Sequence, residues 1–149
     1  MQIRKYVLDT NLYIGAIRDP AKEMALDTFL ERNAPMMYMS AVVVQELRAS
    51  AITDALASAL EKGILRVFER RSRVVGPSVA AFKECGRVLA ALFRRDGVSL
   101  RERPRSLVND ILLAVSCRES GMTLLTDDGD FQIIRPHVRG FAFLPPWPA

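Results

Sequence analysis

The sequence predicts an α/β fold built on a parallel sheet, and three observations support this prediction. Short apolar runs alternate with longer stretches whose apolar residues recur at helical spacing. The clearest runs end at polar residues that are suited to begin a helix. With 149 residues, 50% of them hydrophobic and 26% charged, the chain has the size and composition of an ordinary globular domain. We therefore expect one domain over residues 1–149.

The first strand is expected within residues 3–8, a run rich in β-forming residues that stops at Asp9, Thr10 and Asn11. In a parallel α/β sheet, ligands bind outside the carboxyl ends of the strands, which is where Asp9 would stand. A purely structural alternative stays open at this point, because Asp9 or Asn11 could serve only to cap the following helix.

Two helices and a second strand are expected next. Leu12, Ile14 and Ile17 suit a short helix, and Asp19-Pro20 starts another with proline at its first position. The apolar side of that second helix is expected to contain Met24, Leu26, Phe29 and Leu30. Residues 36–39 then form a short apolar run typical of a strand.

Ser40 is an expected N-cap, and the helix it begins contains Glu46. Helical glutamates are commonly surface residues, but this strand–cap–helix pattern repeats the one around Asp9. A further helix should begin at Thr53 or Asp54 and stop at Gly63. Residues 64–68 fit either a short strand or a continued turn, and the sequence does not decide between them.

Another helix should begin after Ser78 and end near residues 94–97. Its apolar face contains Val79, Phe82, Val88, Leu89, Leu92 and Phe93. This face could serve a partner, although core packing is the simpler use. Residues 94–105 are basic and aperiodic, which indicates an exposed loop; its arginines are Arg94, Arg95, Arg101, Arg103 and Arg105.

The clearest helix is expected to start at Ser106 and stop at Gly121, with Asp110 in or just past its first turn. An acid there would favour the helix dipole, which is its structural explanation. Residues 122–126 predict a buried strand that leads into Asp127, Asp128 and Asp130. Residues 141–143 fit an edge strand.

The charge and the cysteines restrict the partners and the compartment. The formal charge is +4, the pI is about 9.4, and arginine outnumbers lysine, which permits a polyanionic partner. Cys85 and Cys117 are far apart, and no signal peptide is evident, so we expect a reducing cytoplasm. No apolar run approaches the ~18 residues of a spanning helix, so no membrane association is expected.

Acids at strand ends and early in helices suggest metal chemistry. Right-handed crossovers bring such junctions to one edge of a parallel sheet. Carboxylates that converge there repel one another, and a hard divalent cation such as Mg²⁺ or Mn²⁺ removes that conflict. Other chemistries fit worse, because the chain has a single histidine, two separated cysteines, and no phosphate-binding glycine loop or serine nucleophile elbow.

Four segments resemble the acidic motifs of PIN-domain nucleases, in the family's order: residues 7–14 (VLDTNLYI), 40–47 (SAVVVQEL), 109–117 (NDILLAVSC) and 124–131 (LLTDDGDF). Length and basic charge look most like VapC-type ribonuclease toxins of toxin–antitoxin modules. The resemblance implies a three-layer α/β/α domain whose central, mainly parallel twisted sheet has four or five strands.

The resemblance also implies site residues. Asp9, Glu46, Asp110 and Asp128 match the four family acids, as catalytic residues and ligands of Mg²⁺ or Mn²⁺. Asp9 and Asp110 would hold the main ion, with Glu46 and Asp128 as further or water-mediated ligands. Asn11 and Thr126 match polar residues lining the site. Asp130 is expected to cap a helix or support the ligands, and Asp127 occupies a variable position. Asn109 departs from the small residue that the family often has there.

The leading hypothesis is therefore metal-dependent hydrolysis of RNA, with the arginines of residues 94–105 contacting the RNA backbone. The resemblance further implies a cognate antitoxin protein and a homodimer. Two alternatives stay open. One is a metal-dependent phosphohydrolase of small phosphoesters, although that class usually has a second acid where this chain has Asn11. The other is a non-catalytic nucleic-acid-binding domain.

Overall fold

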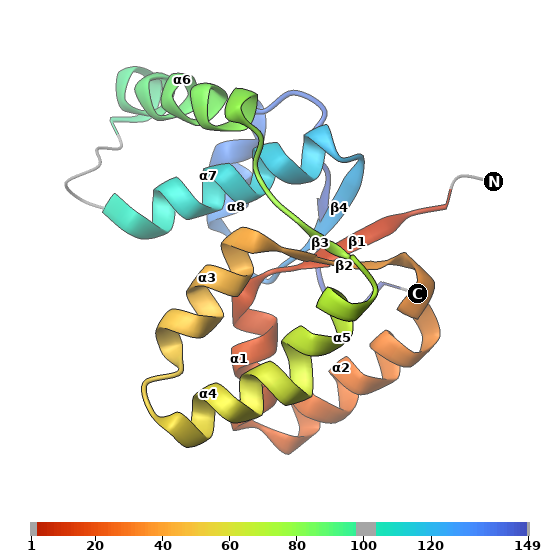
Figure 1. The fold of residues 1–149 in the computed structure, drawn as a ribbon. Coiled ribbons are helices and arrows are strands. Elements are labelled where there is room, and N and C mark those ends of the chain that lie inside the picture. Colours follow the sequence, from red (N-terminus) through yellow and green to blue (C-terminus); the bar gives the residue numbers. More distant parts are fainter. Residues whose placement is uncertain (1–2, 98–103, 149) are drawn as a thin grey trace.

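The structure, a computed structural model, describes residues 3–97 and 104–148. Its described strands form one five-stranded, all-parallel sheet in the order β3-β2-β1-β4-β5 (Figure 1). The strands are β1 (Lys5–Leu8), β2 (Met37–Ser40), β3 (Val74–Val75), β4 (Met122–Leu125) and β5 (Phe143–Leu144). This confirms the predicted α/β class and parallel sheet.

Helices cover both faces of the sheet, which gives three layers (Figure 1). One set, drawn below the sheet, comprises α1 (Thr10–Arg18), α2 (Pro20–Asn33), α3 (Ala41–Ser50), α4 (Asp54–Leu60) and α5 (Arg66–Arg70). The set above it comprises α6 (Val79–Asp96), α7 (Pro104–Glu119) and α8 (Asp130–Ile134). Short 3₁₀ turns cover Ala34–Met36 and Arg135–His137, and a π turn covers Glu61–Leu65.

The register of the central strands aligns the carboxyl ends of β1, β2 and β4, where the predicted acids follow. Val7 pairs with Tyr38 on one side and with Leu124 on the other, and Leu8 pairs with Leu125. The carboxyl ends of β1, β2 and β4 therefore lie next to one another at one edge of the sheet. The strands stay in place because their side chains are buried against both helical layers.

The chain from residue 54 to residue 70 differs from the prediction. Gly63 does not stop the helix: α4 continues through the π turn into α5, so residues 64–68 are helical. The physical reason is burial, because Leu60, Leu65 and Phe68 all face the core from this one rod. That burial outweighs the ~1 kcal/mol helix penalty of one glycine.

Three other boundaries also differ. Arg94 and Arg95 lie in the last turn of α6, so they are not part of a loop, and Gly97 closes that helix in the left-handed conformation. Helix α7 begins at Pro104, two residues before Ser106, because proline suits a first helical position. The last strand is Phe143–Leu144; Phe141 instead packs against Phe131, with ring centroids 6.0 Å apart.

Two predicted apolar faces are only partly buried. On α2, Leu26 and Phe29 are in the core, but Met24 is 71% exposed. On α6, Val88 and Leu92 are buried, whereas Phe82 and other apolar side chains point outward. Helix α6 therefore uses one side for the core and leaves a second apolar side uncovered by the described residues. None of the described helices has the length and apolarity that crossing a membrane requires.

Candidate active site

Asp9 stands directly after β1 and performs two local tasks. Its backbone is extended, and its Oδ1 accepts a hydrogen bond of 2.8 Å from the Thr10 backbone N–H, so it caps α1. Its Oδ2 accepts a hydrogen bond of 2.7 Å from the Thr126 hydroxyl. The capping role is thus confirmed. Asp9 also stands at the carboxyl end of the sheet, beside the end of β4, so the capping role does not exclude a functional one.

Asp9 is only 4% exposed. Burial raises its pKa to about 6, although the hydrogen bonds from Thr126 and Thr10 act in the opposite direction. Asp128 and Glu46 raise this pKa further by charge repulsion. Asp128 and Glu46 are therefore both near enough to Asp9 to act on it electrostatically.

Glu46 projects from the second turn of α3, a helix capped by the Ser40 hydroxyl at the end of β2. Its Oε1 accepts a hydrogen bond of 2.8 Å from the Thr10 hydroxyl. Thr10 therefore joins the first and second strand ends. Sequence reasoning missed this residue; the available signal was a hydroxyl next to the first acid.

Asp110 lies near the end of the second turn of α7, because that helix begins at Pro104. It is thus too far from the helix terminus for a simple dipole role. Burial raises its pKa to about 8, and repulsion from Asp9, Asp128, Glu46 and Asp130 adds to the effect. Burial is thus the main cause of the shift, and four neighbouring acids act on Asp110 in the same direction.

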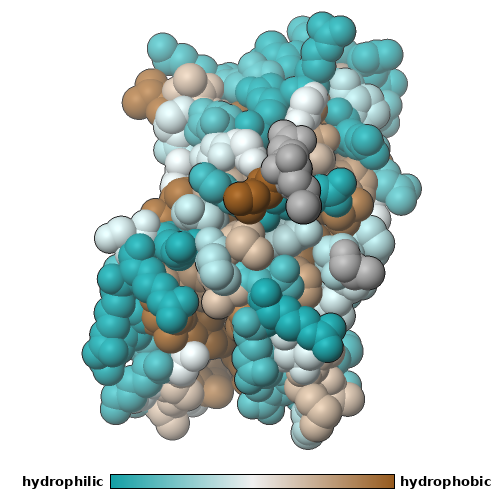
Figure 2. All heavy atoms as spheres, turned by 90° about the vertical axis from the view of Figure 1, so that its right-hand side faces the viewer, coloured by the Kyte–Doolittle hydropathy of each residue, from teal (hydrophilic) through white to brown (hydrophobic). Residues whose placement is uncertain are grey.

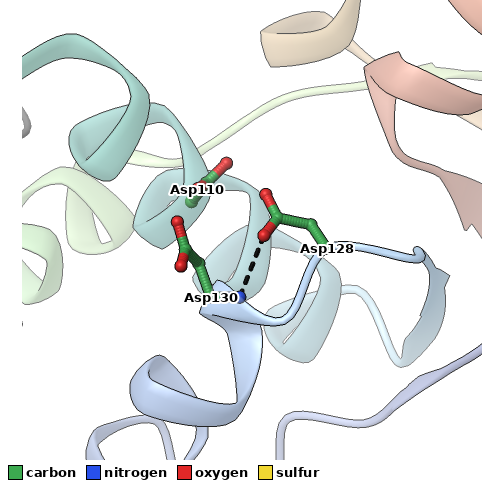
Figure 3. A group of neighbouring side chains, drawn as sticks. All are labelled: Asp110, Asp128 and Asp130. Carbon is green, nitrogen blue, oxygen red and sulfur yellow. Dashed lines mark hydrogen bonds between the residues drawn. The ribbon is translucent and has the colours of Figure 1, made fainter.

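The loop after β4 brings in two more carboxylates. The Thr126 hydroxyl accepts a hydrogen bond of 3.0 Å from the Asp128 backbone N–H, and Asp128 Oδ1 accepts one of 2.9 Å from the Asp130 backbone N–H. Figure 3 shows Asp110, Asp128 and Asp130 directed toward one another. Carboxylate oxygens of these three residues all lie within 4.8 Å of one another.

The donor set fits a hard divalent cation. It consists of the carboxylate oxygens of Asp110, Asp128 and Asp130, and the pKa values of Asp110 and of the neighbouring Asp9 are raised. Bringing a cation to this space would offset the repulsion and favour the ionised forms. Mg²⁺ and Mn²⁺ prefer such oxygen ligands.

The other predicted site residues fall in different places. Thr126 is buried and contacts Asp9, as described above, whereas Asn11 is exposed. Asp130 starts α8 and lies within the three-carboxylate group, closer to the centre than its sequence position suggested. Asp127 is exposed. Asn109 accepts a 3.4 Å hydrogen bond from Gln45, beside the cluster.

The arginine candidates are only partly described. Arg94 and Arg95 are exposed at the end of α6. Arg101 and Arg103 lie outside the described residues. Arg105 belongs to α7, but its side chain is not among those described.

We expect Thr126→Val to raise the pKa of Asp9 further, because the variant loses the hydrogen bond that favours the ionised carboxylate. It should also lower the free energy of unfolding by about 2 kcal/mol, since the hydrogen bonds to Asp9 and from the Asp128 backbone N–H are both lost at nearly constant volume. Carboxyl-detected NMR titration and urea denaturation measure the two effects. Thr123→Val on the same strand is the matched control, and an unchanged Asp9 pKa in Thr126→Val would contradict this account.

The family model of the PIN domain matches residues 6–135 of the chain. No curated protein matches the sequence. Among solved structures, the chain is similar to one from DNA-bound VapBC of Salmonella typhimurium, with 20% identity, a TM-score of 0.68, and coverage of 96% of this chain and 98% of that chain.

Two other solved structures show a similar fold. One is FitAcB from Neisseria gonorrhoeae, with 20% identity, a TM-score of 0.65, and coverage of 97% of this chain and 99% of that chain. The other is VapBC2 from Rickettsia felis bound to a promoter DNA fragment, with 20% identity, a TM-score of 0.60, and coverage of 94% and 97%. At this identity the likeness establishes the architecture.

Proposed function

The chain belongs to the PIN-domain family, and we propose on that premise that it is a metal-dependent endoribonuclease and the toxin of a toxin–antitoxin pair. PIN domains are nucleases, so the family makes the protein a hydrolase in general terms. The observation that supports the proposal is the group of carboxylates formed by Asp110, Asp128 and Asp130, beside the strand ends where Thr126 holds Asp9 and Thr10 holds Glu46. The family match, which spans most of the chain, also supports a single domain over residues 1–149.

PIN nucleases generally use divalent metals, and the acidic cluster fits such an ion. We propose Mg²⁺ or Mn²⁺ as the ion, with Asp110 and Asp128 as ligands together with Asp9. Glu46 would contribute directly or through water, and the geometry adds Asp130 as a further candidate ligand. When bound, such an ion neutralises phosphate charge and lowers the pKa of a water molecule.

The residues of the chain supply the positioning. Thr126 holds Asp9 Oδ2 through its hydroxyl proton and also accepts from the Asp128 backbone, so one side chain fixes two carboxylates. Thr10 holds Glu46 Oε1 in the same way. Both Asp9 oxygens accept hydrogen bonds, which suits a fixed ligand better than an attacking nucleophile. This favours the nuclease over the aspartyl phosphohydrolase alternative.

Charge supports RNA as the substrate. The net charge of +4 and the exposed Arg94 and Arg95 are suited to a phosphate backbone. Binding that depends on such contacts should weaken as salt concentration rises, by a slope set by the number of phosphates neutralised. We propose the arginines of residues 94–105 as these contacts.

The partners follow from the similar structures. VapBC and FitAB are toxin–antitoxin complexes, which supports a cognate antitoxin for this chain. A homodimer is also proposed, and the uncovered apolar side of α6 supports it, since Val79, Phe82 and Phe93 are all exposed.

Reduced, buried Cys85 and Cys117 are compatible with the proposed cytoplasmic location.

The test is a cleavage assay on structured RNA and, in parallel, on a small phosphoester such as p-nitrophenyl phosphate, a monoester. We expect RNA cleavage with Mg²⁺ or Mn²⁺, its loss with EDTA, and its return when either ion is added back. Preference for the small phosphomonoester would favour the phosphohydrolase alternative. Absence of cleavage of both substrates with either ion would contradict the proposed enzyme.

A further inference from the structure

A hydrogen bond between two amide side chains joins the two helical layers beside the carboxylates. The Gln45 Nε2 group on α3 donates to Asn109 Oδ1 on α7 over 3.4 Å. These helices cover opposite faces of the sheet (Figure 1), so the bond spans the edge where the carboxyl ends of the strands lie. The two residues directly precede Glu46 and Asp110 in the chain. The amide pair therefore stands at the same edge of the sheet as the predicted acids.

The amide pair lies on the solvent side of these acids. Gln45 is exposed, Asn109 is half-buried, and the hydrogen bond between them is exposed to solvent. Successive residues of a helix point about 100° apart, and the acid that follows each amide is directed inward. Glu46 Oε1 accepts from the Thr10 hydroxyl, and Asp110 belongs to the three-carboxylate group shown in Figure 3. A strand of RNA that reaches the acids from solvent therefore passes beside the amide pair.

The two amides keep most of their hydrogen-bonding capacity. Neither Gln45 nor Asn109 makes another side-chain hydrogen bond with residues 3–97 and 104–148. Because Asn109 Oδ1 accepts from Gln45, the Asn109 amide is oriented, and its Nδ2 donors and second Oδ1 lone pair are available to a ligand. A donor beside an acceptor matches the edge of a nucleobase, and unpaired RNA bases are read at such edges.

A second polar hollow, lined by arginines, lies too far away for this task. It has a volume of about 460 Å³, and Arg4, Arg118 and Arg135 line it. Its lining residues Arg4 and Gly121 directly precede β1 and β4, so it lies at the amino ends of these strands. Figure 2 looks onto that side of the molecule, where the surface is mostly hydrophilic. The carboxylates stand at the opposite ends of the same strands, so a base next to a phosphate held there meets the amide pair instead.

We propose that Asn109 contacts the base next to the scissile phosphate, and that Gln45 is a positioning residue that holds the Asn109 amide for this contact. Adenine is the expected base, because its N6 group donates and its N7 atom accepts beside it, which suits a single amide. The inference rests on the proposed ribonuclease function. It concerns which position of the RNA is cut, whereas the carboxylates determine whether cleavage occurs.

The experiment is cleavage of an RNA library with a randomised unpaired segment, with Mn²⁺ present and the ends of the products sequenced. We expect about a tenfold enrichment of adenine at one position next to the cut, as one bidentate contact implies. Asn109→Leu should abolish this enrichment, because it keeps the side-chain size and removes both polar groups. The enrichment is a ratio within the products of one protein, so it does not depend on the overall rate.

Further variants separate base contact from a structural role. Asn109→Gln, which retains an amide, should keep part of the enrichment. Gln45→Met should lower it, and should lower it no further once Asn109 is already leucine, because Gln45 acts through Asn109. Gln132→Met removes an exposed amide from α8 and is the matched control, with normal cleavage and normal enrichment.

Wild-type cut sites without a preferred base, or an adenine enrichment that Asn109→Leu retains, would overturn the inference. An enrichment of another base would overturn the assignment of adenine to this contact. Failure of the nuclease proposal has a different signature, because the wild type would then produce no cut ends with either ion, and both proposals would fall together.

Discussion

Asp110→Asn is expected to reduce RNA cleavage by about 10³-fold and, without metal, to make the protein more stable at pH 8. The first effect follows because the variant loses an anionic ligand at the point where the cluster converges. The second follows because the amide removes the cost of burying an ionised carboxylate and, to a lesser degree, the repulsion from the neighbouring acids. If the acids had only a structural role, Asp110→Asn would not both reduce cleavage and stabilise the metal-free protein.

The measurements are RNA cleavage under single-turnover conditions and thermal unfolding in EDTA. Asp127→Asn is the matched control, because it removes one exposed carboxylate from the same loop system without touching the three-carboxylate group. Asp127→Asn should cleave normally. Normal cleavage by Asp110→Asn would remove Asp110 from the proposed machinery.

A second large effect is the pH dependence of stability in the absence of metal. The pKa values of Asp9 and Asp110 are raised to about 6 and about 8 in the folded protein, from 3.8. The folded state therefore binds more protons than the unfolded state between these values. The stability that this proton uptake contributes is fully present below pH 3.8 and is lost as pH rises through 6 and then 8.

We expect the free energy of unfolding in EDTA to fall by roughly 2 kcal/mol between pH 5.5 and pH 8.5, a figure reduced from the single-group value because the acids interact. Urea denaturation at several pH values measures this slope. Asp110→Asn should flatten the slope, as should a saturating divalent cation. A slope of the opposite sign, or one that Asp110→Asn leaves unchanged, would show that burial and repulsion do not raise the pKa values of Asp9 and Asp110.

The approach of the four acids was predictable because it depends on topology. Asp9 follows β1, Glu46 follows β2 by two helical turns, and Asp128 follows β4; parallel strands place their carboxyl ends at one edge. No special rotamer or loop shape is needed for this convergence. The roles of these residues stay predictions, but their proximity follows from the order of strands and helices.

Other features depend on details that a sequence pattern does not contain. Asp130 joins Asp110 and Asp128 because its backbone N–H donates to the Asp128 side chain, which folds the loop back. Thr10 reaches Glu46 through one side-chain rotamer. Both interactions depend on local side-chain and loop conformations, which the topology of the sheet does not determine.

The continuous helical segment from α4 to α5 shows why the local sequence predicted a wrong helix end at Gly63. Gly63 is a helix breaker by propensity, but the burial of Leu60, Leu65 and Phe68 keeps the chain helical. Tertiary packing therefore outweighed the local propensity there. A sequence window around Gly63 contains no information about the core in which Leu60, Leu65 and Phe68 are buried.

The most direct test of the central claim is calorimetric titration of Mn²⁺ into the metal-free protein at pH 7, with Asp110→Asn, Asp128→Asn and Asp127→Asn beside the wild type. We predict saturable binding to wild type and to Asp127→Asn, proton release on binding, and at least a tenfold loss of affinity in the other two variants. Equal affinities for all four proteins, or no saturable binding to the wild type, would contradict a carboxylate-held cation at this edge of the sheet.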